Sequence, residues 1–131
     1  MPSATADEYY SDALLRRVLE QSRVIALVGA SADWKRPSSF AMKYLQGKGY
    51  RVIPVNPGRA GTEILGETTY AHLAEIPEKI DMVDIFRKPE AVGEVVDEAL
   101  ELGIPVVWMQ LGIRHNEAAA RAQAAGATVI M

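Results

Sequence analysis

Apolar positions gather in short runs at fairly regular intervals along the chain. Five such runs are rich in β-branched residues and almost continuous rather than alternating with polar residues. Continuous apolar runs of four or five residues are typical of strands that are buried on both faces of a parallel sheet. The five predicted strands are Val24–Val28, Arg51–Val55, Met82–Phe86, Val106–Met109 and Thr128–Met131.

The segments between these runs show the spacing of helices. Leu14, Leu15, Val18 and Leu19 recur at helical intervals and predict a helix over Glu8–Gln21. Glycines close several of the later segments, as expected of the left-handed residue that follows a helix. The later predicted helices are Ser39–Gly47, Ala71–Glu75, Glu90–Leu102 and Glu117–Ala125, and the closing glycines are Gly47, Gly103 and Gly126.

A strand that alternates with a helix requires crossover connections, which produce parallel sheets covered by helices. The sequence therefore predicts an α/β fold: a Rossmann-like, doubly wound, five-stranded parallel sheet with helices on both faces. With Val24–Val28 as the central strand, right-handed crossovers favour the strand order 3-2-1-4-5 in chain numbering. We expect residues 1–22 to form an extension with one helix, and residues 23–131 to form the domain.

Composition narrows the possible functions. The 131 residues carry a net charge of −3, which argues against a general nucleic-acid surface. Without cysteine, the chain has neither disulfides nor thiolate metal sites. The N-terminal residues lack a signal-peptide pattern, and no apolar run approaches the length of a membrane span, so we expect a cytoplasmic protein without membrane contact.

In a doubly wound sheet, ligands bind beyond the carboxyl ends of the strands. After the first predicted strand, Gly29 and Ala30 are small enough to let a ligand approach the backbone. Ser38 or Ser39 is expected to cap the following helix, whose N-terminus favours an anion. The cations of this turn are Lys35 and Arg36, and together these features favour a phosphate site over a merely solvated loop.

The end of the second predicted strand leaves two interpretations open. The Gly-x-Gly-x-x-Gly dinucleotide pattern is absent, as is the acidic residue that would hold a free ribose. Asn56 and Arg59 stand there instead, which suits a phosphorylated ribose, as in NADP or coenzyme A. The residues Asn56-Pro57-Gly58 are equally typical of a plain turn.

The later strand ends add polar groups at the same edge. Arg87 follows the third strand near a helix N-terminus, where a bound anion would relieve an unfavourable charge. Gln110 follows the fourth strand, and Gly112 would permit close approach, whereas Trp108 and Met109 are expected in the core. His72 and His115 belong to no recognisable metal or catalytic pattern, and no serine has a nucleophile-elbow context.

Taken together in order, the strand-end segments resemble one family, the small stand-alone CoA-binding proteins. That family is in turn similar to the N-terminal domain of the succinyl-CoA synthetase α subunit. The resemblance covers the chain from about Arg23 onward. The segments that carry it are Gly29-Ala30-Ser31, Pro54-Val55-Asn56-Pro57, Gly61-Thr62-Glu63-Ile64-Leu65-Gly66, Val83-Asp84-Ile85-Phe86-Arg87 and Trp108-Met109-Gln110-Leu111-Gly112-Ile113-Arg114-His115.

The resemblance implies that coenzyme A lies across the strand ends. It assigns the diphosphate region to Gly29, Ala30 and Ser31, with help from Lys35, Arg36 and Ser38. It assigns the adenosine to Val55, Asn56 and Pro57, with Arg59 near the 3′-phosphate. It places Phe86, Arg87 and Gln110 beside the nucleotide or the start of the pantetheine arm.

The resemblance also implies features that the sequence up to Met131 does not show. These are an Asp-Arg-Cys-containing tail and the synthetase's second domain with its phosphorylated histidine. We therefore expect no enzyme activity, but a module that binds CoA or an acyl-CoA as a carrier, sensor or partner of another protein. The alternatives are a fragment of an NADP-dependent oxidoreductase and an interaction protein with a vestigial nucleotide site.

Overall fold

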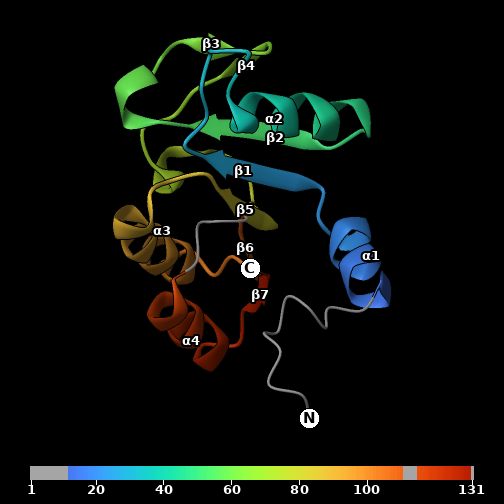
Figure 1. Ribbon diagram of the computed structural model, residues 1–131, viewed down its shortest axis with the longest axis vertical. Helices are drawn as coiled ribbons and strands as arrows, with labels where there is room; N and C mark the ends of the chain where they lie inside the picture. Colours follow the sequence, from blue (N-terminus) through green and yellow to red (C-terminus); the bar gives the residue numbers. More distant parts are fainter. Residues whose placement is uncertain (1–11, 111–114, 131) are drawn as a thin grey trace.

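A single parallel sheet forms the centre of the molecule in the computed structural model, which describes residues 12–110 and 115–130 (Figure 1). All its strand pairs are parallel, and its strands match the five predicted runs to within a residue or two. The prediction of a five-stranded parallel sheet is confirmed. The strands are β1 (Val24–Val28), β2 (Arg51–Val55), β5 (Met82–Ile85), β6 (Val106–Met109) and β7 (Thr128–Ile130).

The predicted strand order is wrong. The sheet has the order β2-β1-β5-β6-β7, which is 2-1-3-4-5 when its strands are counted along the chain. β5 pairs directly with β1, with Ile25 opposite Met82, so β5 rather than β1 is the middle strand. Right-handed crossovers permit both orders. Burial distinguishes them, because all four residues of β5 are buried, whereas β2 begins with the exposed Arg51.

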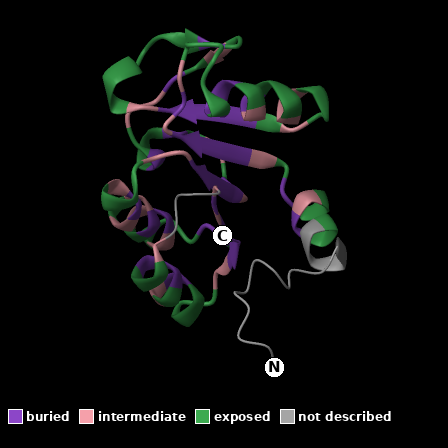
Figure 2. Cartoon of the chain, viewed as in Figure 1, coloured by how far each residue is buried: buried purple, intermediate pink, exposed green. Residues whose placement is uncertain are grey.

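Helices cover both faces of this sheet, as predicted (Figure 1). On one face, Val83 and Ile85 pack with Val92 and Val96 of α3 and with α4 and the 3₁₀ turn η3. On the other face, Ile25 packs with Val18 of α1, and Leu27 packs with Met42 of α2. The strands are accordingly buried while the outer sides of the helices are exposed (Figure 2). These elements are α1 (Asp12–Gln21), α2 (Pro37–Gly47), η3 (Leu73–Glu75), α3 (Pro89–Glu101) and α4 (Asn116–Ala124).

The segment between β2 and β5 differs from expectation. It contains the 3₁₀ turn η2 (Pro57–Arg59) and an antiparallel hairpin of β3 (Glu63–Ile64) and β4 (Glu67–Thr68). Strands of two residues are too short to leave a periodic pattern in the sequence. The helix predicted over Ala71–Glu75 is only the single turn η3, a length at which tertiary contacts rather than propensity decide the structure.

The glycine signals for helix ends were correct in two cases out of three. Gly103 and Gly126 follow the last residues of α3 and α4 and have positive φ values of 70° and 93°. Gly47 is the last residue of α2, as predicted, but the left-handed residue beyond the helix is Gly49, with φ 94°. Gly47 and Gly49 are two residues apart, so the sequence alone does not show which of them adopts the left-handed conformation.

Candidate functional site

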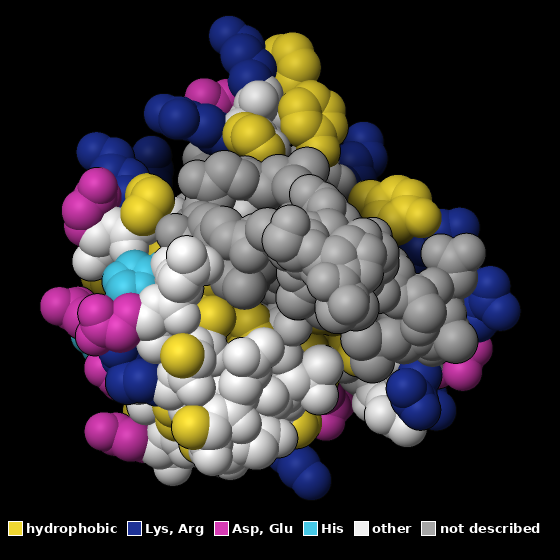
Figure 3. Space-filling view, turned by 60° about the horizontal axis from the view of Figure 1, so that its bottom comes forward, with side chains coloured by type: hydrophobic (Ala, Val, Ile, Leu, Met, Phe, Trp, Pro, Cys, Tyr) yellow, Lys and Arg dark blue, Asp and Glu magenta, His cyan; other side chains and the backbone are white. Residues whose placement is uncertain are grey.

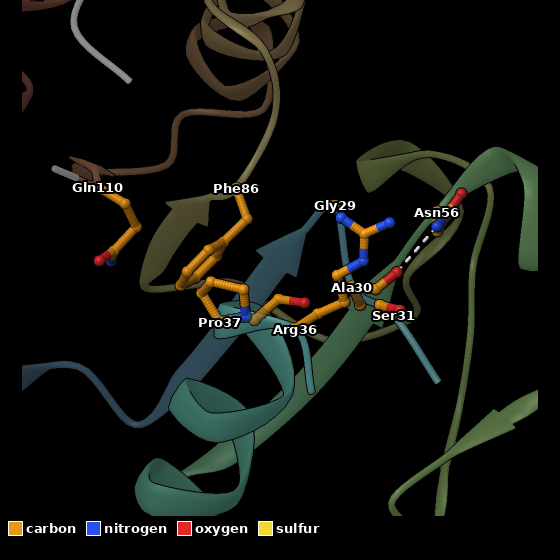
Figure 4. Close-up of a pocket in the computed structure, with 9 residues that line it drawn as sticks. Gly29, Ala30, Ser31, Arg36, Pro37, Asn56, Phe86 and Gln110 are labelled. Carbon is orange, nitrogen blue, oxygen red and sulfur yellow. Dashed lines mark hydrogen bonds between the residues drawn. The ribbon is translucent and has the colours of Figure 1, made fainter. Parts of the chain in front are cut away.

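A groove crosses the carboxyl ends of the strands where β1 and β5 meet (Figure 4). Its first part has a volume of about 560 Å³ and is bounded by the turn after β1, the start of α2 and the ends of β2, β5 and β6. A second hollow of about 600 Å³ shares part of this lining and continues along the start of α3. The groove is lined by Gly29, Ala30, Ser31, Arg36, Pro37, Ser38, Asn56, Phe86 and Gln110, then by Arg87, Lys88, Glu90, Ala91 and Glu94.

The position of this groove follows from the strand order. The chain leaves β1 toward one face of the sheet and leaves β5 toward the other, so the two connections separate at their carboxyl ends. This is the switch point at which doubly wound sheets bind ligands. Most of the predicted site residues therefore meet at one place although the predicted strand order was wrong, because both orders put the strand ends on the same edge.

A close backbone contact within the fold requires glycine at position 29. Its φ is +93°, and a Cβ there would lie 2.3 Å from the carbonyl oxygen of Phe86. The glycine thus allows the ends of β1 and β5 to touch, which forms the floor of the groove. Ala30 is also buried, with 1% of its surface exposed.

Asn56 joins the turns after β1 and β2. Its side-chain nitrogen donates to the carbonyl oxygen of Ala30 at 2.8 Å, the dashed line in Figure 4. Its side-chain oxygen accepts from the N–H of Gly58 at 2.9 Å and caps η2. The two interpretations of this segment are thus compatible, since Asn56 forms the turn and also lines the groove.

The start of α2 carries the most distinctive polar feature of the groove. The helix begins at Pro37, and the residue in the cap position, Arg36, makes no capping hydrogen bond with its side chain. The predicted cap by Ser38 or Ser39 is wrong, because both lie inside the helix. Ser39 Oγ lies 2.8 Å from the carbonyl oxygens of Ser31 and Asp33 and so fixes the turn itself.

Ser38, unlike Ser39, has a hydroxyl group without a hydrogen-bond partner. It is 3% exposed, it lines the groove, and its Oγ has no hydrogen-bond partner. Among the described residues, one other buried side-chain N or O atom lacks a hydrogen-bond partner. It is Thr69 Oγ1, which does not line the groove. A buried hydroxyl without a partner costs free energy, and a ligand oxygen in the groove would satisfy it.

Three cations line the groove: Arg36, Arg87 and the exposed Lys88. The Arg36 side chain extends across the end of β1 between Phe86 and Asn56, and its contact with Asp33 is long, at 4.0 Å (Figure 4). Arg87 is half-buried and lines the second part. No described residue forms an ion pair with Arg87, so its charge is available to an anion.

The other predicted residues lie farther out. Lys35 stacks over the exposed ring of Trp34 at 5.8 Å, and Arg59 is exposed at the end of η2; neither lines the groove. Val55 and Pro57 instead border a small adjoining hollow of about 130 Å³, together with His72 and Arg87. Gly112 lies outside the described residues.

Sequence reasoning missed one residue behind the groove. Asp84 lies in the middle of β5, is 5% exposed, and accepts a hydrogen bond from the side-chain nitrogen of Gln110. Burial raises the pKa of Asp84 to about 7, and the hydrogen bond from Gln110 opposes that rise. A carboxyl residue within an otherwise apolar strand was the signal that could have identified it.

The described side chains visible in Figure 3 carry mixed charges. On the face shown in Figure 3, Lys and Arg side chains lie beside Asp and Glu side chains rather than forming one continuous basic area. Within residues 12–110 and 115–130, no group of three metal-binding side chains comes together. In that same part of the chain, no helix is both long and apolar enough to span a bilayer.

The fold and the groove define a Rossmann-like α/β domain with a ligand site at its switch point. The chain belongs to the family of CoA binding domains, whose model matches residues 23–131, and the resemblance seen in the sequence is thereby confirmed. It is 40% identical to the uncharacterized protein YneT of Bacillus subtilis (strain 168) over 121 residues, which are 92% of this chain and 88% of that protein.

Solved structures agree with this assignment. A hypothetical protein from Pyrococcus horikoshii OT3 superposes with a TM-score of 0.91 and 38% identity, over 99% of this chain and 90% of that one. The dinucleotide-forming acetyl-coenzyme A synthetase 1 of Ca. Korarchaeum cryptofilum superposes with a TM-score of 0.73 and 27% identity. That match covers 88% of this chain but 27% of the synthetase, so the domain also occurs as part of a larger protein.

Proposed function

We propose that the groove binds coenzyme A or an acyl-CoA, with the diphosphate at the start of α2. The observation that carries this proposal is the buried, unpartnered Ser38 hydroxyl in the groove beside a helix N-terminus that no side chain caps. The exposed N–H groups of a helix start carry partial positive charge and bind phosphate oxygens well. Family membership makes coenzyme A the appropriate anion.

The charges of the groove suit a diphosphate. Arg36 reaches over the end of β1 from the same turn, and the first turn of α2 contains no acidic residue that would repel an anion. A phosphate oxygen there would accept from Ser38 Oγ and from the Ser38 N–H while Arg36 neutralises the charge. Pro37 has no N–H, and the N–H of Ser39 donates to the carbonyl oxygen of Arg36. Charge-assisted hydrogen bonds of this kind are each worth about 1.5–3 kcal/mol.

Coenzyme A fits this site better than NADP. The glycine-rich fingerprint that lets a dinucleotide pyrophosphate lie against the first turn is absent, since only Gly29 is present. Gly29 is moreover required by the contact with Phe86. The residues assigned to adenosine by the family resemblance, Val55 and Pro57, do come together beside Arg87 in the adjoining hollow.

We further propose that the chain acts in the cytoplasm as a carrier, sensor or partner module and turns over no substrate alone. The described residues offer no metal cluster, and the groove contains no serine or histidine paired with a base. Steady conversion of an acyl-CoA by the pure protein, abolished by one substitution in the groove, would contradict this part of the proposal.

Two matched variants test the proposal. Ser38→Ala and Thr69→Val each remove a buried hydroxyl that has no partner, but Ser38 alone lines the groove. Neither variant should lose stability, because no hydrogen bond is broken in the free protein. In calorimetric titrations, Ser38→Ala should bind CoA about tenfold more weakly, whereas Thr69→Val should bind it like the unaltered protein. Equal CoA affinity in both variants would show that the diphosphate does not lie at α2.

A further inference from the structure

Asp84 stands directly behind the far end of the groove. It occupies the middle strand, opposite Leu27 of β1 and Trp108 of β6, and its side chain is buried among apolar neighbours. Among the described residues, its one hydrogen-bond partner is Gln110, which lines the groove at the end of β6. Burial of a carboxyl group in such a place destabilises the fold, which points to a role for Asp84 other than stability.

The hydrogen bond between these residues fixes the orientation of the Gln110 amide. Above its pKa of about 7, Asp84 is ionised and can only accept, so the Gln110 nitrogen points toward it, as in the structure. The amide oxygen of Gln110 is then left for the groove, and no described residue donates to it. This end of the groove thus presents an acceptor backed by a negative charge, whereas the α2 end presents donors and positive charge.

We infer that Asp84 is a positioning residue that makes Gln110 a hydrogen-bond acceptor for the amide N–H groups of the pantetheine arm. This inference rests on the proposed function. The diphosphate has no proton to donate near neutral pH, and above the pKa of Asp84, about 7, the negative charge of this residue repels an anion. The Asp84–Gln110 pair therefore directs the neutral, amide-bearing arm over β5 and β6 and leaves the phosphates at α2.

The test compares CoA with adenosine 3′,5′-bisphosphate, which lacks the pantetheine arm. Titrations are carried out at pH 8.5, above the pKa of Asp84, which burial raises to about 7. Asp84→Ala and Gln110→Met should each weaken CoA about five- to tenfold and leave the bisphosphate unchanged. The double variant should bind CoA no more weakly than Gln110→Met alone, because Asp84 acts through Gln110.

Asp81→Ala is the matched control. Its carboxylate accepts from the N–H groups of Arg23 and Val24 at 2.9 and 3.0 Å, at the opposite edge of the sheet. This variant should lose stability but change the affinity for both ligands equally, if at all. If Asp84→Ala does not fold, Asp84→Asn takes its place, with a smaller selective loss expected because asparagine can hold the amide in either orientation.

The outcomes separate the inference from the proposed function. Equal loss of both ligands in the Asp84 variant, or losses that add to those of Gln110→Met, would show a purely structural role and overturn the inference. Unaltered protein that binds neither CoA nor the bisphosphate would instead contradict the proposed function itself.

Discussion

The two ends of the groove differ in charge and in how far their polar groups are already paired. At the start of α2, Arg36 and a helix N-terminus without a side-chain cap lie beside the unpartnered hydroxyl of Ser38. At the end of β6, Gln110 is held by the buried Asp84. The first end attracts an anion, and the second repels one but accepts a hydrogen bond. A ligand that is anionic in one part and amide-bearing in another satisfies both.

The largest effect that we expect is that of the buried Asp84 on the free energy of unfolding. The pKa of Asp84 rises from 3.8 in the unfolded chain to about 7 in the folded protein through burial. The folded state then binds more protons, so this residue makes the unfolding free energy fall as the pH rises from about 4 to 7 and adds no further slope above that. Urea unfolding of Asp84→Asn should lack this slope. Identical pH profiles for both proteins would contradict the burial of a titrating carboxyl.

The next largest effect is a loss of stability at Gly29, in the floor of the groove between its two ends. Gly29→Ala forces a Cβ against the backbone of Phe86 at a φ of +93°, so it should destabilise the protein by about 2–4 kcal/mol. Gly126→Ala is the control, because Gly126 has the same φ of +93° but no atom within 4 Å of its Cβ position. It should cost about 1–2 kcal/mol, for the backbone conformation alone. Equal midpoints in urea unfolding would show that β1 and β5 do not touch at this point.

A smaller effect tests the charge of the α2 end. Arg36→Ala should weaken CoA and dephospho-CoA alike by about tenfold, since both contain the diphosphate. Lys35→Ala removes a neighbouring cation that lies over Trp34 outside the groove, and should have a weaker effect on both. Added salt should reduce these differences, because Arg36 is mostly exposed. A loss confined to CoA would place Arg36 at the 3′-phosphate instead.

The most selective effect concerns the 3′-phosphate, because it falls on one of the two ligands only. Arg59→Ala should weaken CoA by about tenfold while leaving dephospho-CoA nearly unchanged, if Arg59 contacts that group. Arg87→Ala is the informative counterpart, because Arg87 lines the groove and Arg59 does not. A selective loss in Arg87→Ala alone would move the 3′-phosphate to the end of β5. An equal loss of both ligands in Arg59→Ala would contradict its assignment.

The sequence predicted the strands well and the connections less well. The five strands are continuous apolar runs, so their burial can be predicted from the residues of each strand alone. The strand order depends instead on which face each crossover covers, and two orders obey the same chirality rule. The β3–β4 hairpin and the turn η3 are too short to show a period.

The candidate site was predictable as a position rather than as a set of contacts. Residues after the strands meet because parallel strands end on one edge, which placed Asn56, Phe86 and Gln110 in the groove. Tertiary packing determines that Ser38 Oγ has no hydrogen-bond partner and that Asp84 pairs with Gln110. Neither feature can be predicted from a local sequence pattern.

CoA binding in the groove is tested most directly by a calorimetric titration of the unaltered protein with CoA and with NAD at one salt concentration. We expect measurable binding of CoA and none of NAD, because the groove has an anion site at α2 but lacks the dinucleotide glycines. Micromolar binding of NAD, with none of CoA, would contradict this expectation.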